Sequence, residues 1–159
     1  MPARTATVMP VDVQIASALA ELPSVAHIEG WVSAALDELG EDGEPPGLCI
    51  RVVDGEESRE LNARFRGQDK PTNVLSFPAD VDLPEAKLLG DIVICAPIVG
   101  AEAAEQGKSP EDHFAHMVVH GVLHLSGYDH EQAGEAELME AIEKRILERV
   151  GIADPYAER

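Results

Sequence analysis

The sequence has few basic side chains, few cysteines and no long apolar segment. Its 12 Lys and Arg face 30 Asp and Glu, a formal net charge of −18. This imbalance argues against nonspecific nucleic-acid binding, because phosphates are held by Lys and Arg. The two cysteines, Cys49 and Cys95, form no C-x-x-C pair, so we expect two small reduced core residues.

Membrane and secretion signals are also missing. No stretch of about 18 apolar residues could span a bilayer, and residues 1–23 contain no sustained apolar segment typical of a secretion signal. We therefore expect a soluble, cytoplasmic protein without a membrane partner.

At 159 residues the chain has the length of one domain, which can bury a core without a structural metal. Apolar periodicity predicts a helix over 56–65 with Leu61 and Phe65 facing inward. We expect residues 1–10 to be disordered and 11–159 to form a single α+β domain. That domain should have a small mixed four-stranded sheet, about five helices and a buried metal-binding helix. The other predicted elements are strands at 11–15, 48–53, 74–77 and 91–95 and helices at 24–39, 109–126 and 131–150.

The few basic residues are unevenly distributed. Residues 51–70 hold five of the twelve together with five acids, so this window is neutral while the remainder carries the whole −18. A neutral-to-basic patch on an acidic body would admit a phosphate locally, and the alternative is an ordinary solvated helix face.

Three histidines define the most informative segment of the chain. Residues four apart on a helix lie about 40° apart around its axis, so the rings of His120 and His124 can reach one point. Gly127 can end the helix and let the chain return toward it with His130. Three neutral nitrogens and one open position are the ligand set of a catalytic zinc site. We therefore expect one Zn²⁺ per chain, bound by His120, His124 and His130.

The same spacing, H-x-x-x-H-x-x-G-x-x-H, occurs in metzincin proteases. Their general base is a glutamate directly after the first histidine, and this chain has Gly121 there. A metalloprotease is therefore disfavoured. Because glycine inside a helix costs about 1 kcal/mol relative to alanine, we expect Gly121 to serve close packing against a strand more than room beside the metal.

Other polar residues near the histidines have two interpretations each. On the same helix face, His113 and His116 are expected to be hydrogen-bonded core residues, although His116 could orient a ligand ring or relay a proton. Asp129 is either an exposed turn residue or a group that orients His130 or transfers a proton.

A polar turn at 66–73 carries the groups that bind an oxyanion. The planar fork of Arg66 fits two phosphate oxygens, which a lysine could not reproduce. We therefore expect Arg66 to be catalytic and to bind substrate together with Lys70 and Asn73. The alternative for Asn73 is that its side chain caps its own backbone.

Four motifs in order resemble those of the YbeY family of bacterial endoribonucleases and rRNA maturation factors, and the similarity covers roughly 48–157. They are L-N-x-x-F-R-G at 61–67, D-K-P-T-N-V-L-S-F-P at 69–78, L-G-D-I-V-I-C at 89–95 and H-M-V-V-H-G-V-L-H-L-S-G-Y-D-H at 116–130.

The resemblance implies a metal-dependent endoribonuclease that cleaves single-stranded RNA in 16S rRNA 3′-end maturation and 70S ribosome quality control. It also implies zinc at His120, His124 and His130 and a functional arginine at Arg66. The implied partners are the 16S rRNA precursor and the 30S and 70S ribosomes. A ribosomal protein or assembly GTPase would help to target so acidic a protein to RNA.

The nucleophile is left open by the residues. Water activated by the ion attacks unaided, Asp129 or His116 relays the proton, or the 2′-OH of the RNA attacks. Two other classes also remain. A non-catalytic, metal-stabilised ribosome assembly factor would keep the histidines without needing Arg66, and a metzincin-like metalloprotease would need a glutamate at position 121.

Overall fold

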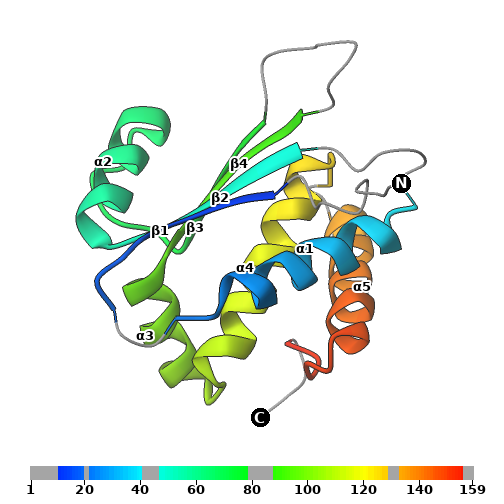
Figure 1. Ribbon diagram of the computed structural model, residues 1–159. Coiled ribbons are helices and arrows are strands. Elements are labelled where there is room, and N and C mark those ends of the chain that lie inside the picture. Colours follow the sequence, from blue (N-terminus) through cyan, green and yellow to red (C-terminus); the bar gives the residue numbers. More distant parts are fainter. Residues whose placement is uncertain (1–10, 20–21, 41–46, 79–87, 129–132, 156–159) are drawn as a thin grey trace, which may run out of the picture.

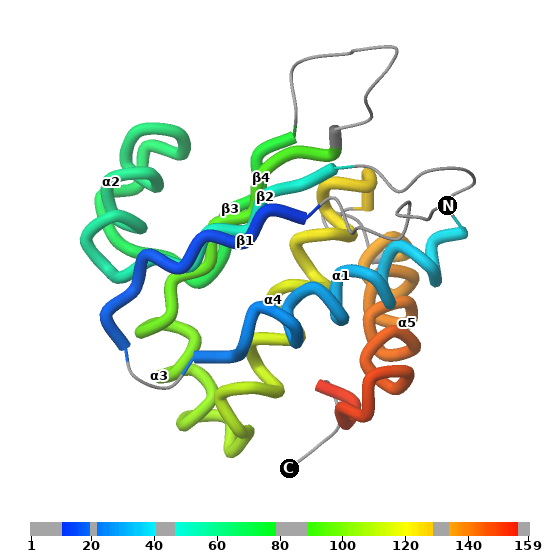
Figure 2. The backbone as a smooth tube through the Cα atoms, in the orientation of Figure 1, coloured from blue at the N-terminus to red at the C-terminus, as the bar shows by residue number. Residues whose placement is uncertain are grey.

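In the computed structural model the described residues are 11–19, 22–40, 47–78, 88–128 and 133–155, so the expectation for residues 1–10 lies outside them. The described strands form one sheet in the order β1-β2-β4-β3 (Figures 1 and 2). The first three run parallel, and β3 pairs antiparallel to β4 at the edge. The strands are β1 (Val11–Ala16), β2 (Gly47–Val53), β3 (Val74–Pro78) and β4 (Leu88–Cys95).

Five helices occur in the described parts of the chain. They are α1 (Val25–Glu38), α2 (Gly55–Arg66), α3 (Ala96–Gln106), α4 (Pro110–Leu125) and α5 (Ala133–Arg149). The main core lies between one face of the sheet and α1, α4 and α5. A smaller core on the other face lies under α2 (Figure 1). The predicted α+β single domain with a mixed four-stranded sheet and five helices is therefore confirmed.

The central helix, α4, is the one that the sequence predicted to be buried. It begins after Ser109, whose hydroxyl accepts a hydrogen bond from the Asp112 amide, and Pro110 occupies the first turn. Eleven of its sixteen residues are buried, and it contacts α1, α3, α5, β3 and β4. The histidines on α4 are therefore held by a helix packed on nearly all sides.

Gly121 allows α4 to lie close to the sheet. A Cβ built at this position would stand 3.0 Å from both Cδ1 and Cγ2 of Ile92 on β4. The expected packing role of this glycine is thus visible in the structure. A larger side chain at position 121 would collide with the sheet.

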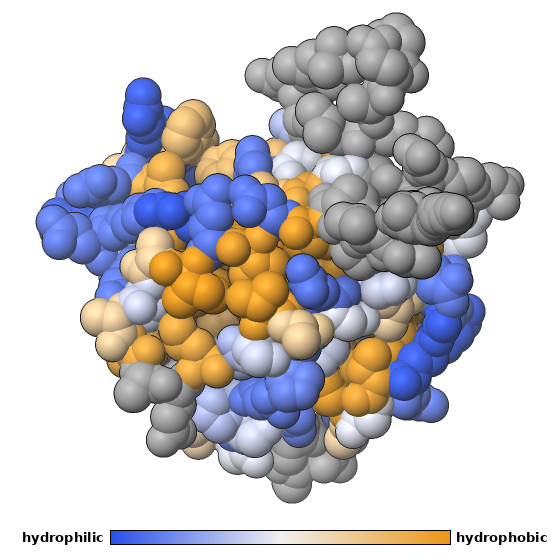
Figure 3. Space-filling view, viewed as in Figure 1, coloured by the Kyte–Doolittle hydropathy of each residue, from blue (hydrophilic) through white to orange (hydrophobic). Residues whose placement is uncertain are grey.

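The surface of α2 is mainly hydrophilic, whereas apolar side chains gather between β1 and α1 (Figure 3). The prediction that Phe65 faces inward is wrong, because this ring is 55% exposed. Leu61, one turn earlier, does pack on the smaller core. Phe65 lies in the last turn of α2, and its ring contacts Phe77, which itself packs on that core, so Phe65 lies outside the core. No helix within the described ranges has both the length and the apolar character needed to cross a membrane.

Candidate metal and phosphate site

Four histidines follow one face of α4 from the core to a surface cleft. Successive ring centroids are 6.0, 6.2 and 4.6 Å apart. His113 and His116 are buried, at 3% and 7% exposure, whereas His120 and His124 are half-buried and line the cleft. The last two therefore present their rings to a ligand that enters from solvent.

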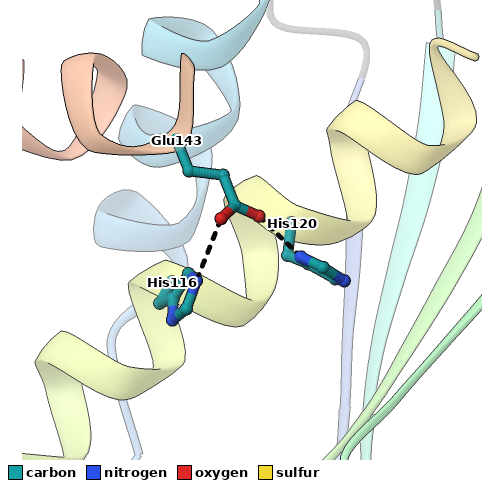
Figure 4. A group of neighbouring side chains, drawn as sticks. All are labelled: His116, His120 and Glu143. Carbon is teal, nitrogen blue, oxygen red and sulfur yellow. Dashed lines mark hydrogen bonds and ion pairs between the residues drawn. The ribbon is translucent and has the colours of Figure 1, made fainter. Parts of the chain in front are cut away.

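A buried carboxylate connects two of these rings. Glu143 on α5 is 0% exposed, its Oε2 lies 2.6 Å from Nδ1 of His120, and its Oε1 lies 3.3 Å from Nε2 of His116 (Figure 4). A buried carboxylate accepts hydrogen bonds, so this contact places a proton on Nδ1 of His120, and in the neutral tautomer that matches it Nε2 carries none. The Nε2 atom of His120 then has a lone pair on the cleft side.

The cleft-side nitrogens of His120 and His124 are close together. Their Nε2 atoms are 3.1 Å apart. Two nitrogens that bind one tetrahedral Zn²⁺ at 2.0–2.1 Å are separated by about 3.3 Å. The pair in the structure therefore fits two ligands of a single zinc ion. Two other residues predicted for the site, His130 and Asp129, lie outside the described residues.

A second grouping includes the buried residues. The ligand atoms of His116, His120 and Glu143 lie within 4.8 Å of one another, so this group could hold a metal ion. The sequence prediction did not include Glu143. A signal was present, because Glu143 lies between Ile142 and Ile146 on the apolar face of an amphipathic helix, where a charge needs a partner.

The cleft beside the histidines has a volume of about 580 Å³ and brings α2, the following turn, β3 and α4 together. No Asp or Glu is among the described residues that line it. The lining consists of Asn62, Arg66, Gln68, Thr72, Asn73, Val74, Leu75, Ser76, Pro78, His120 and His124. An uncharged to basic cleft in so acidic a chain favours an anionic ligand.

Arg66 extends across the cleft from the end of α2. The helix ends there because Gly67 adopts a left-handed conformation with φ of 71°. One guanidinium N–H of Arg66 donates to the carbonyl oxygen of Ser76 on β3 at 3.1 Å. This contact occupies one of five donors, so the fork can still bind a second partner.

The two other residues predicted to bind substrate are placed differently. Asn73 lines the cleft, but its Nδ2 donates to Glu102 at 3.1 and 3.2 Å and its Oδ1 accepts from the Val74 amide at 2.6 Å. The contact of Oδ1 agrees with the alternative interpretation, in which Asn73 caps its own backbone. The Nδ2 atom is already bonded to Glu102. Lys70 is exposed beside the cleft, and its carbonyl accepts from Asn62 Nδ2 at 2.8 Å.

His113 is a hydrogen-bonded core residue. Its Nε2 lies 2.9 Å from Oε1 of Glu102, the carboxylate that also holds Asn73. Burial lowers the pKa of His113, and the hydrogen bond to Glu102 only partly opposes this effect. A neutral His113 therefore supports one wall of the cleft through Glu102.

The cysteines match their prediction only in part. Both are free thiols; Cys95 is buried and Cys49 is half-buried. Desolvation raises the pKa of each thiol, which favours the unreactive protonated form.

Fold and site together define an α+β protein that could hold a metal ion next to an anion-binding cleft. The chain belongs to the YbeY endoribonuclease family, because the family model described as Endoribonuclease YbeY matches residues 14–151. The resemblance seen in the sequence motifs is thereby confirmed.

Individual relatives agree with this assignment. An Endoribonuclease YbeY from Alkalilimnicola ehrlichii is 59% identical over 143 residues, which cover 86% of this chain and 84% of that protein. One from Halorhodospira halophila is 53% identical over 144 residues, covering 88% and 92%. The solution structure of a Thermotoga maritima protein superposes with a TM-score of 0.60 at 31% identity, covering 87% of this chain and 88% of that one.

Proposed function

We propose that this protein is a zinc-dependent, single-strand-specific endoribonuclease that acts in 16S rRNA 3′-end maturation and 70S ribosome quality control. The observation that carries the chemical part is the cleft, which brings Arg66 together with His120 and His124 and has no carboxylate in its described lining. A phosphodiester is the anion that fits such a lining in an RNA-processing family. The rRNA part rests on the family to which the chain belongs.

The zinc would be bound by His120, His124 and His130. The 3.1 Å separation of the two cleft-side nitrogens supports this set, and so does the Glu143 carboxylate behind His120. Carboxylates that accept from the far nitrogen of a ligating histidine fix its tautomer and raise its basicity. A site at His116, His120 and Glu143 would instead need the 2.6 Å hydrogen bond to break. When bound, the ion supplies Lewis-acid polarisation of a phosphoryl oxygen.

The chain's own groups have distinct roles in this proposal. Arg66 binds the nonbridging oxygens of the scissile phosphate and stabilises the charge that grows there during displacement. Its bond to Ser76 holds the guanidinium across the cleft. His116 is 7% exposed and hydrogen-bonded to Glu143, so it supports that carboxylate more readily than it reaches RNA. Asp129 stays a proposed proton-transfer group, and both water and the RNA 2′-OH stay possible nucleophiles.

Its partners would be the 16S rRNA precursor and the 30S and 70S ribosomes in the cytoplasm. A net charge of −18 weakens attraction to RNA in general. A ribosomal protein or assembly GTPase that binds the acidic surface would compensate for this weakness. Lys70 and Asn73, beside Arg66, would contact the RNA next to the scissile phosphate.

A protease would need a base where this chain has Gly121. That position faces Ile92 at 3.0 Å, so a glutamate there would have no room. Peptide hydrolysis is therefore disfavoured both by the absence of the glutamate and by the lack of space for one.

The proposal is tested by cleavage of matched substrates with Arg66→Ala and Arg66→Lys. Loss of a single preorganised donor to a transition-state oxyanion costs about 10²- to 10³-fold in rate. We expect such a loss for alanine and little recovery for lysine, because an ammonium lacks the fork. Arg59→Ala is the matched control: it removes an exposed arginine of α2 that is paired with Asp69 outside the cleft.

The substrates are single-stranded RNA, duplex RNA, single-stranded DNA and unfolded protein, each with and without zinc. We expect cleavage of unpaired RNA and no cleavage of duplex RNA or protein, because a rigid duplex rarely aligns a phosphate for in-line displacement. Single-stranded DNA should be inert if the 2′-OH attacks. A 2′,3′-cyclic phosphate end would assign the attack to the 2′-OH, and a 5′-phosphate end would assign it to water. Metal-dependent proteolysis with intact RNA would overturn the nuclease. If zinc stabilises the chain but neither RNA nor protein is cleaved, the protein is the non-catalytic assembly factor.

A further inference from the structure

We propose that Phe65 and Phe77 form a nucleobase-binding pocket for the nucleotide next to the cleaved phosphate, with the Arg64 guanidinium beside the Phe65 ring. The pocket lies on the α2 face of the sheet, around the edge of β3 from the histidines. This inference rests on the proposed endoribonuclease function and adds a base-stacking subsite to it.

The pocket is built from two aromatic rings over an aliphatic floor. The Phe65 and Phe77 ring centroids are 5.1 Å apart with 62° between the ring planes. They line a cavity of about 660 Å³ that also includes Leu61 and Val93. Aromatic rings that flank an apolar hollow are the usual surface on which an unpaired base stacks, and stacking is tolerant of sequence.

The pocket and the catalytic cleft are adjacent. Pro78 lines both of them. Phe65 directly precedes Arg66 on α2, and Phe77 directly follows Ser76 on β3, so each ring has a cleft-lining neighbour in sequence. Because β3 is the last strand of the sheet, an RNA backbone can pass around its outer edge with its phosphate in the cleft and its base in the pocket.

Phe65 is an exposed aromatic residue in a chain that has few aromatics. The chain has only six aromatic residues, and two of them, Trp31 and Phe114, are buried at 5% and 3% exposure. Phe65 is 55% exposed on a helix whose surface is otherwise mainly hydrophilic (Figure 3). The Arg64 guanidinium carbon lies 5.5 Å from the centre of its ring. A guanidinium next to an aromatic face can stack on a base and also attract the adjoining phosphate.

The charge pattern points to the same path. Arg64, Arg66 and Lys70 form no ion pair with any described carboxylate. In contrast, Arg51, Arg59, Lys144, Arg145 and Arg149 are all paired with acids. The three cations with no such pair therefore follow one another along the end of α2 and the next turn, beside the pocket and the cleft.

The polar rim of the pocket suits a base better than a phosphate. Arg51 donates two hydrogen bonds to Glu57, at 2.6 and 3.0 Å, so its charge is neutralised there. Asp91 is exposed on the same rim and would repel a phosphate. An uncharged heterocycle enters without that repulsion.

The test uses a short unpaired oligoribonucleotide with 2-aminopurine, a fluorescent base whose emission is quenched by stacking, placed next to the cleavage site. Phe65→Ala should fold normally because the ring is exposed. We expect it to lose the protein-induced quenching and to bind the RNA about 5- to 150-fold more weakly, the range found for one stacked base. The KM for cleavage should rise by the same factor, while kcat changes little.

Two further variants make the result specific. Phe65→Trp keeps an aromatic face and should retain both quenching and affinity, whereas Phe65→Leu keeps apolar area alone and should behave like alanine. Leu138→Ala is the matched control, because Leu138 is an apolar helical side chain with 54% exposure on α5. It should leave every readout unchanged.

Each remaining outcome rejects the pocket. Normal quenching and KM in Phe65→Ala, or full function in Phe65→Leu, would reject base stacking while cleavage by the wild type kept the nuclease assignment intact. A wild type that neither binds nor cleaves the oligoribonucleotide would reject the nuclease and the pocket together.

Discussion

Replacing Glu143 by glutamine changes one atom in the buried support of the proposed zinc site. The carboxylate is 0% exposed and lies 2.6 Å from Nδ1 of His120. A glutamine keeps the volume and one acceptor oxygen, but it is uncharged and one of its two polar ends is an N–H donor. If Glu143 orients and activates His120, zinc should still bind, with lower affinity.

The size of the effect follows from the carboxylate's position behind the ligand. Loss of such a partner typically weakens metal binding about 10- to 100-fold. If the proposed zinc binds only the folded chain, the same factor reduces the stabilisation by zinc by about 1.4 to 2.7 kcal/mol. For a domain of this size, each kcal/mol corresponds to about 2 to 4 °C in Tm. The zinc-induced rise in Tm should therefore be about 3 to 11 °C smaller in the Glu143→Gln variant.

The affinity is measured by competition with a chromophoric chelator, and the Tm by calorimetry with and without zinc. Glu140→Gln is the control, because Glu140 is exposed on the same helix. An unchanged affinity in Glu143→Gln would refute the orienting role. Complete loss of stoichiometric zinc would show that Glu143 is itself a ligand and would favour the group formed with His116 and His120.

Three other outcomes are expected. His124→Ala should purify without zinc by elemental analysis, because too few protein ligands remain, and full occupancy would place the site elsewhere. Gly121→Ala should destabilise the fold by about 1 kcal/mol in urea denaturation, since the contact of the new Cβ with Ile92 at 3.0 Å outweighs the gain in helix propensity. Gly100→Ala is the control: a Cβ there has no neighbour within 4 Å, so the substitution should stabilise the fold by a similar amount. Burial lowers the pKa of His113 in the folded chain, so as the pH falls this residue is protonated in the unfolded chain before it is protonated in the folded one. The free energy of unfolding should therefore decrease as the pH drops below 6.5 toward the lowered pKa. His113→Gln should flatten this dependence by up to about 1.4 kcal/mol per pH unit, and an unchanged slope would exclude His113 as its source.

The order of helices and strands and the histidine part of the proposed site could be predicted from the sequence. Ser109 and Pro110 mark the start of α4, and the apolar residues all around that helix indicate that it is buried. The spacing of His120 and His124 places both rings on one face, because four residues make slightly more than one helical turn. These features depend on backbone geometry within a few residues, which the local sequence determines.

Tertiary structure decided which groups meet across elements. Glu143 comes 23 positions after His120 and reaches its ring only because α5 packs beside α4. The amide of Asn73, in the turn before β3, is held by Glu102 on α3, and no local pattern shows this. Phe65 was assigned to the core from helical periodicity, yet its ring packs on Phe77 from outside and stays 55% exposed. Periodicity identifies the apolar face of a helix, but the length of that face that becomes covered depends on the packing of distant segments.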